Sequence, residues 1–195
     1  GHGAHPDKAI DTFYLTAHVI LALNAIVSRR LDPFVPAAVS IGSVNGGFTE
    51  NVIPESVRIT GTLRFTDSDT HEQLHKEIRR AFEITKTMGG NYELEFEIGG
   101  PPMINDRHVS SMIQQVAEDL LGKESVHEPH KSLGAEDFGS FMEHAPGAMF
   151  RLGVQKKGHE DYPLHHPKFD LDERALPFGA AVLVETTLRF LKNNH

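Results

Sequence analysis

Apolar side chains recur at helical spacing over residues 6–28, where Ile10, Phe13, Ala17 and Ile20 lie three or four positions apart. This period predicts one long amphipathic helix. Pro6 and the acidic residue after it are typical of a helix start. We therefore expect the chain to open with a helix that buries one face.

Two extended segments are expected next. Residues 37–41 predict a strand, and residues 57–65 alternate apolar with polar side chains around Gly61. Strict alternation is typical of a half-buried strand. Between the two segments, the glycine-rich Asn45-Gly46-Gly47 predicts a turn.

A second helix and a third strand complete this region. Asp69 with Glu72 resembles a capping box, and the helix is expected to end at Gly89-Gly90. Its predicted buried stripe consists of Leu74, Ile78, Ala81, Phe82 and Thr85. From residue 92 to 98 apolar residues alternate with three glutamates, which predicts a strand with one solvated face.

The order helix, strand, strand, helix, strand is the ferredoxin-like split βαβ pattern without its opening strand. We therefore predict the α/β class, with an α+β first region. Because Gly1 stands just before the first helix, where the opening strand would end, we expect a truncated or processed chain.

Gly99-Gly100-Pro101-Pro102 separates this region from a differently patterned one. Residues 101–195 predict a helix that Asn105 or Asp106 caps and Gly122 ends. A short helix over 136–143, an apolar strand over 148–154 and a last helix over 177–191 are expected to follow. So few elements do not close a core, which indicates part of a larger α/β domain.

Composition narrows the class of protein. The net charge of −8 comes from 27 acidic and 19 basic residues, which disfavours nucleic acid and anionic membranes as partners. Apolar runs of about 18 residues are absent, so we expect no spanning helix. The chain has 0 cysteines, which fits a reducing compartment, and we expect a cytoplasmic protein.

Two adjacent histidines, His165 and His166, lie between Pro163 and Pro167. Each proline favours an extended predecessor, so we expect a stiff loop in which adjacent side chains point in opposite directions. One imidazole is then able to face a site as a metal ligand. Two solvated surface histidines are the alternative that the spacing alone leaves open.

Other candidates have both a functional and a structural interpretation. The small residues around His2 and His5 allow a ligand to approach closely, or form an ordinary loop. Glu136 is expected in the first helical turn, where the helix dipole favours carboxylates whatever their role. His71 and His75 have the i, i+4 spacing of zinc ligands, but they lack the glutamate of a His-Glu-x-x-His motif.

Six segments, in this order, carry a family resemblance: GHGAHPDKAID, GGFTENVIP, GTLRF, LGAEDF, PGAMFRLG and LHHPKFDLDERALPFG. Together they resemble the metal-dependent amidohydrolases and peptidases of the aminoacylase, hippurate hydrolase and auxin-conjugate hydrolase group. The resemblance implies a catalytic α/β domain that binds two divalent metals, Zn, Mn, Ni or Co. It also implies a ferredoxin-like lid, over residues 1–100, that mediates homodimerisation. Residues 101–195 would then be the C-terminal part of the catalytic domain.

The resemblance implies roles for particular residues. His165 falls at the family's final metal ligand, with His166 beside it in a supporting position. His2 falls at the lid histidine that reaches a partner subunit's active site and contacts the oxyanion. Asn51 and Arg64 fall at lid positions that contact substrate, which would be an N-acyl amino acid or a small peptide.

The same resemblance assigns Glu136 to the wall of the site. The family's other metal ligands and its glutamate general base match no residue here, so we expect an incomplete metal centre and no activity of this chain alone. A non-catalytic dimerisation or binding module is the alternative. A ferredoxin-like small-molecule regulatory domain would explain residues 6–98 but not residues 164–179.

Overall fold

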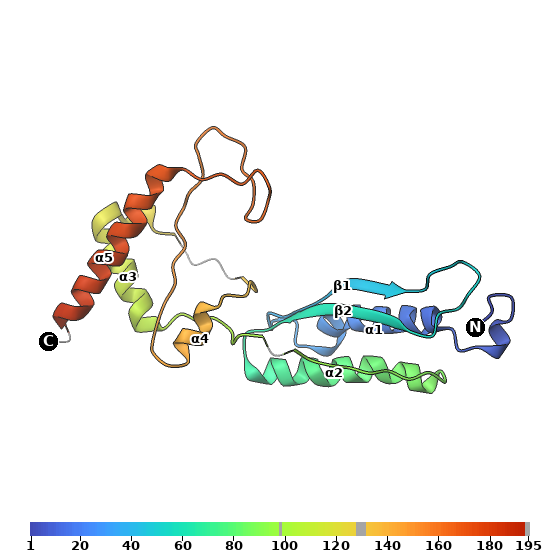
Figure 1. Ribbon diagram of the computed structural model, residues 1–195. Coiled ribbons are helices and arrows are strands. Elements are labelled where there is room, and N and C mark those ends of the chain that lie inside the picture. Colours follow the sequence, from blue (N-terminus) through green and yellow to red (C-terminus); the bar gives the residue numbers. More distant parts are fainter. Residues whose placement is uncertain (98, 128–131, 194–195) are drawn as a thin grey trace. The chain divides into compact units, whose positions relative to one another are not determined.

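The computed structural model describes residues 1–97, 99–127 and 132–193, coloured along the sequence in Figure 1. They form two compact units. The first consists of Gly1–Pro102 with Ser132–Glu136, and the second of the described parts of Met103–Lys131 and Asp137–His195. Each unit is considered by itself.

The first unit contains, in chain order, α1 (Thr12–Arg30), β1 (Ala38–Gly46), β2 (Val57–Arg64) and α2 (Ser68–Thr87). This order confirms the predicted one. The two strands are antiparallel, with Ala38 opposite Arg64 and Gly46 opposite Val57. Together with the family of similar structures reported below, this mixture of helices and a small antiparallel sheet confirms the α/β class.

Helix α1 begins later than the sequence predicts. The Asp11 side chain accepts hydrogen bonds from the backbone N–H groups of Phe13 (3.0 Å) and Tyr14 (3.1 Å). An aspartate in this position satisfies donors that the first turn leaves open, so it fixes the start of the helix. Pro6–Lys8 forms a separate 3-10 turn instead.

The capping residue of α2 also differs from the prediction. Asp67, rather than Asp69, accepts from the Thr70 backbone N–H and the Thr70 hydroxyl, both at 2.8 Å. These bonds to the ionised carboxylate lower the pKa of Asp67. The predicted pairing of Asp69 with Glu72 as the cap is therefore wrong.

Strand β1 is longer than predicted, because Asn45 and Gly46 pair with Arg58 and Val57. The predicted turn therefore begins at Gly47, whose φ of 72° lies in the left-handed region that favours glycine. The longer strand carries the pairing to the end of the hairpin where the loop between β1 and β2 begins.

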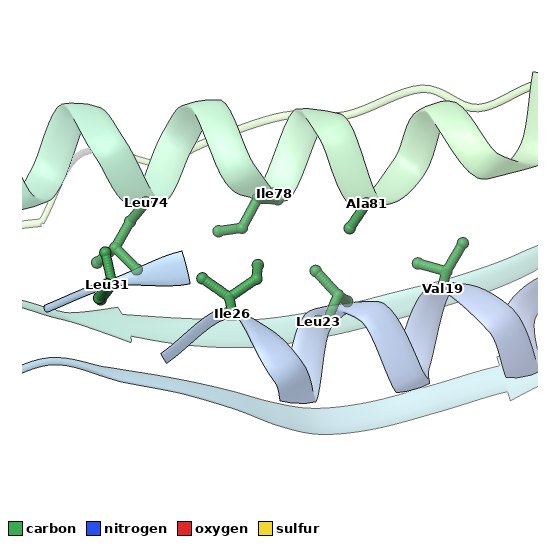
Figure 2. Close-up of a cluster of buried hydrophobic side chains, with 7 residues drawn as sticks. All are labelled: Val19, Leu23, Ile26, Leu31, Leu74, Ile78 and Ala81. Atoms are coloured by element: carbon green, nitrogen blue, oxygen red, sulfur yellow. The ribbon is translucent and has the colours of Figure 1, made fainter. Parts of the chain in front are cut away.

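The core of the first unit lies between α1 and α2. Figure 2 shows Val19, Leu23 and Ile26 of α1 facing α2. The complete buried cluster is Val19, Leu23, Ile26, Leu31, Leu74, Ile78 and Ala81. Side chains of both strands, among them Val39, Ile41, Ile59 and Leu63, pack against it from the sheet.

Residues 92–97 do not form the predicted strand. They pair in no β-ladder within the described residues, and Ile98 lies outside those residues. The predicted alternation is nevertheless confirmed, because Tyr92, Leu94 and Phe96 are half-buried and the glutamates between them are exposed. A ladder needs a neighbouring backbone, and the predicted strand order places the opening strand there.

Helix α1 departs from the expectation that the chain contains no helix able to span a membrane. By length and composition α1 is apolar enough to cross a membrane. In the structure its buried positions, Leu15, Val19, Leu23 and Ile26, form one stripe that contributes to the core. This arrangement is typical of a core helix in a soluble fold.

The second unit contains α3 (Arg107–Leu121), α4 (Phe138–Met142) and α5 (Leu176–Asn193). Short 3-10 turns occupy Lys123–Ser125 and Glu173–Ala175. The predicted start of α3 is confirmed, because the Asp106 side chain accepts from the Val109 N–H at 2.9 Å. Gly122 ends the helix as predicted.

The predicted strand over residues 148–154 is not present. Instead, the Asn105 side-chain amide donates to the Met149 carbonyl (2.9 Å) and accepts from the Met149 N–H (2.8 Å). A side chain therefore satisfies the backbone of Met149 in the way that a neighbouring strand would. Among the described residues of this unit, the buried hydrophobic ones are Val116 and Val182, a small core for a unit of this length.

A truncation of Leu74 tests the α1–α2 core. Leu74 is fully buried, so Leu74→Ala is expected to lower the free energy of unfolding by about 3 kcal/mol. Leu21, which is 69% exposed on α1, provides the control, and Leu21→Ala is expected to change it by less than about 0.5 kcal/mol. Urea unfolding followed by circular dichroism measures both values. Equal effects of the two substitutions would contradict this core.

Candidate functional site

The structure brings two predicted site residues together at one end of the first unit. The Gly3 N–H donates to the Asn51 carbonyl, and the Ile53 N–H donates to the Gly1 carbonyl, both at 2.8 Å. His2 forms an isolated antiparallel bridge with Val52. This backbone pairing therefore places His2 beside Asn51, although the two are far apart in sequence.

The imidazole of His2 is held in one tautomer. Its Nδ1 accepts a hydrogen bond from the Ala4 backbone N–H at 3.1 Å, so the ring proton of the neutral form lies on Nε2. The residue is exposed, and the His5 ring packs edge-on at 5.3 Å between centroids. Its Nε2–H is therefore a donor suited to an oxygen anion.

Asn51 is exposed in the loop that pairs with the start of the chain. Its Oδ1 accepts from the Thr49 hydroxyl at 3.2 Å, so the side-chain amide has a fixed orientation. The same hydroxyl contacts Glu50 (3.1 Å), and hydrogen bonds to Glu50 from its own backbone and from Thr49 lower the pKa of that carboxyl. The oriented polar groups of Thr49 and Glu50 thus lie next to Asn51, the predicted substrate contact.

Arg64 lies at the opposite end of the hairpin. It is opposite Ala38, whereas Val57, next to the loop of Asn51, is opposite Gly46. The length of β2 places the two ends about 23 Å apart, and Figure 1 shows the N-terminus and the loop after β1 at the same end. Arg64 is half-buried, and the described residues provide it with no ion pair. The first unit therefore does not bring Arg64 together with His2 and Asn51.

His165 has a left-handed backbone, with φ of 71°. Among the described residues it is the one non-glycine residue with positive φ. Such a conformation costs of order 1 kcal/mol for a residue with a Cβ, and residues of this kind cluster at functional sites. The side chain is exposed and has no hydrogen-bond or ring partner within the described ranges.

The prediction of an extended histidine pair is wrong. The His166 N–H donates to the Pro163 carbonyl at 3.0 Å, and the Phe169 N–H donates to the His166 carbonyl at 2.9 Å. These bonds fold the segment into consecutive turns, and His165 takes the left-handed position within them. The two side chains still lie in different surroundings, because His165 is exposed and His166 is half-buried.

His166 is held by neighbours that the sequence analysis missed. Its ring stacks on Tyr162, with centroids 4.5 Å apart and planes 10° apart. Its Nδ1 accepts from the Lys168 N–H at 3.1 Å, and the Lys168 ammonium lies 5.5 Å from the Tyr162 ring. The signal in the sequence is an aromatic residue four positions before a histidine that precedes proline.

Glu136 precedes α4 instead of lying in its first turn. Both Glu136 and Asp137 are exposed, and Asp137 at the N-cap makes no side-chain capping bond. The helix-dipole explanation for this pair is therefore weaker than the sequence predicts. Within residues 1–97, 99–127 and 132–193, no three His, Asp or Glu side chains lie close enough together to hold a metal ion.

The pair His71 and His75 has a structural role. His71 stacks on Phe65 at 4.3 Å and meets His75 edge-on at 4.2 Å, and His75 stacks on Phe96 at 3.8 Å between centroids. Arg79 lies 5.0 Å from the Phe96 ring. Burial, then the charges of His71 and Arg79, lower the pKa of His75. This ring stack, Phe65–His71–His75–Phe96, ties residues 92–97 to α2.

A family model, peptidase family M20/M25/M40, matches residues 9–189. The chain therefore belongs to this family.

The names of similar proteins agree with this family assignment. The chain is 33% identical to N-acetyl-L-cysteine deacetylase of Bacillus subtilis, over 100% of this chain and 46% of that protein. It is also 33% identical to IAA-amino acid hydrolase ILR1-like 2 of Arabidopsis thaliana, over 98% of this chain and 44% of the relative. The chain spans about half the length of these relatives.

A solved structure has the same fold. The Bacillus subtilis YXEP protein, described as a dinuclear metal binding peptidase from the M20 family, is 27% identical, with a TM-score of 0.77. The similarity covers 94% of this chain and 47% of that one. The predicted recognition of the amidohydrolase and peptidase family is confirmed.

The ring stack predicts a pH dependence of stability. The folded chain holds the pKa of His75 below the ordinary value of about 6.5 at which the unfolded chain takes up the proton. The contribution of His75 to the free energy of unfolding is therefore fully present above about pH 6.5. It is lost as the pH falls through the lowered pKa of the folded state. His75→Phe keeps a ring against Phe96 and is expected to reduce this loss. Chemical denaturation at several pH values measures it, and an unchanged pH profile in the variant would contradict the assignment.

Proposed function

We propose that this chain is the lid and the C-terminal catalytic part of a metal-dependent amidohydrolase that cleaves the amide bond of N-acyl amino acids or small peptides. The observation that carries the proposal is His165, the one described non-glycine residue with a left-handed backbone, at the family's metal-ligand position. Strain at a family site position is typical of functional residues.

The division of the chain supports the assignment of its parts. The two compact units divide at Pro102, next to the predicted boundary at residue 100, with Ser132–Glu136 as a further segment of the first unit. We assign residues 1–100 to the lid and residues 101–195 to the catalytic domain. Both the length of the relatives and the small core of the second unit favour a catalytic domain that is completed by further polypeptide. The absence of cysteine favours a cytoplasmic location.

The donor chemistry of His165 fits a divalent metal. A neutral imidazole with no other partner in the described residues is a ligand for Zn, Mn, Ni or Co. A bound metal would polarise the scissile carbonyl and make hydroxide available near neutral pH. Within this chain, His166 would hold the turn that presents His165, through its stack on Tyr162. Glu136 would lie in the wall of the site.

The lid residues would divide between two sites. His2 and Asn51 lie at one end of the hairpin and Arg64 at the other. Because about 23 Å separates the ends, we assign the two groups to different active sites of a homodimer. His2 would donate its Nε2–H to the oxyanion in the partner's site, with Asn51 on the substrate beside it. Arg64 would bind a substrate carboxylate.

The homodimer would form through the lid. Strand β1 pairs with β2 along one edge, and its other edge has no partner among the described residues. An unpaired edge strand is a template for pairing with another chain. A two-fold axis at this edge would place equivalent ends of two hairpins symmetrically.

Removal of the His165 imidazole tests the metal role. In a protein of the length of the relatives, His165→Ala is expected to lower bound metal and to reduce amide hydrolysis by at least about 100-fold. His159, an exposed histidine of the same region, provides the control, and His159→Ala is expected to leave both unchanged. Elemental analysis and hydrolysis of an N-acetyl amino acid are the measurements. If His165→Ala leaves both quantities unchanged, His165 is not a ligand and the binding-module alternative is favoured.

Mixed dimers test whether His2 acts across subunits. In a protein of the length of the relatives, the variants His2→Ala and His165→Ala are each expected to be inactive when assayed separately. After subunit exchange, half of the dimers combine the two variants and contain one intact site, so about a quarter of the activity is expected to return. Refolding the variants together and assaying hydrolysis measures this recovery. Mixtures without any recovery would place His2 and His165 in the same subunit's site.

A further inference from the structure

Tyr162 and His166 form a small local core in the loop that contains His165. Within residues 157–170, all of which the structure describes, these two residues are half-buried and the others are exposed. Their rings stack with centroids 4.5 Å apart and planes 10° apart. Stacked rings contribute free energy beyond the area that they bury. This contact is therefore suited to fix the shape of the loop.

Each of the two rings is also held by a second partner. The Tyr162 hydroxyl donates to Glu160 Oε2 at 2.5 Å, and this bond raises the pKa of Tyr162, so the hydroxyl keeps its proton. The His166 Nδ1 accepts from the Lys168 backbone N–H at 3.1 Å, which fixes the plane of the imidazole. The Lys168 ammonium lies 5.5 Å from the centre of the Tyr162 ring. The stack is thus formed between two oriented side chains.

The stack spans the turn in which His165 is left-handed. The His166 N–H donates to the Pro163 carbonyl at 3.0 Å, which closes a four-residue turn. His165 takes the third position, where type II turns place a residue of positive φ, usually glycine. Its φ is 71°, although a residue with a Cβ prefers negative φ by a factor of about five or more.

Tyr162 directly precedes this turn, and His166 is its last residue. A change of φ at His165 reorients the backbone that follows, so it would move the His166 ring away from Tyr162. The stack therefore opposes the relaxation of His165 to negative φ.

We propose that Tyr162 is a positioning residue for His165. Through its stack on His166 it holds the turn in the left-handed form, and this form aims the His165 imidazole as a metal ligand. The proposal rests on the proposed function, in which His165 binds a divalent metal. Tyr162 itself would contact neither the metal nor the substrate. A ligand that is aimed in advance loses less freedom when the metal binds, which raises the affinity.

NMR of the complete 195-residue chain reports the backbone of His165 directly. Positive φ brings the amide and α protons of one residue close together, so His165 is expected to show a strong NOE between them. In Tyr162→Ala this NOE is expected to fall about threefold, as His165 relaxes to negative φ. Tyr162→Phe keeps a ring on His166 and is expected to keep the NOE. Lys157→Ala changes an exposed residue of the same loop and is the control.

A glycine background separates positioning from a purely structural role. Hydrogen exchange of the His166 amide reports the turn, because this N–H closes it. Tyr162→Ala is expected to speed this exchange about fivefold in the native background. In the His165→Gly background it is expected to do so less than about twofold, because glycine takes positive φ without steric cost. Equal acceleration in both backgrounds would show that the stack stabilises the loop without acting through His165.

Zinc binding connects the turn to the metal. In a protein of the length of the relatives, Tyr162→Ala is expected to weaken zinc binding at least about tenfold, as the loss of a group that orients a ligand does. Tyr162→Phe is expected to retain the affinity. Competition with a chromogenic chelator measures it. Should Tyr162→Ala fail to fold by circular dichroism, Tyr162→Leu, which has apolar bulk but no ring to stack, takes its place in all three experiments.

Further results would overturn the proposal. An unchanged His165 NOE in Tyr162→Ala would show that the stack does not set the backbone. Unchanged zinc affinity in Tyr162→Ala, in a protein whose affinity His165→Ala lowers, would show that the ligand needs no such support. If His165→Ala also leaves zinc binding unchanged, the proposed function fails, and Tyr162 has no ligand to position.

Discussion

The contact between α1 and α2 is the constraint on which the first unit depends. The buried stripe of one helix faces that of the other, and Ile26 and Leu74 are almost completely removed from water. Each such side chain contributes about 2 kcal/mol of hydrophobic stabilisation. Helix α1 packs against α2 on this side and against both strands of the hairpin on another. The positions of the hairpin ends, and of the residues at them, follow from this packing.

Two imidazoles are positioned by different physical means. His2 is oriented by a hydrogen bond to its own Nδ1 from the next turn of backbone, which fixes the tautomer without strain. His165 is oriented by its backbone, because the turns around it place it in the left-handed region. That conformation costs of order 1 kcal/mol, a noticeable part of the 5–15 kcal/mol that stabilises a typical domain. A histidine persists there although glycine would be easier to accommodate.

Local signals predicted the elements better than their ends. Asn105 or Asp106 was expected to cap α3, and Asp106 does so, whereas the Asn105 side chain bonds to the backbone of Met149. At α2 the prediction chose Asp69, but Asp67, two positions earlier, is the residue that caps the helix. For residues 92–97, likewise, one feature was predicted and another was not. Their alternation predicted which side chains are buried, but the ladder requires a second backbone that the pattern of one segment does not encode.

The sequence by itself determined the helices, the two strands of the hairpin, the alternation of buried faces and the family to which the chain belongs. These depend on neighbouring residues and on short motifs, which the order of amino acids states directly. Only the tertiary structure decided that His2 lies beside Asn51 and far from Arg64, and that His165 is left-handed. Long-range backbone pairing and turn geometry depend on how loops close over a shared core, and that closure is a property of the whole unit.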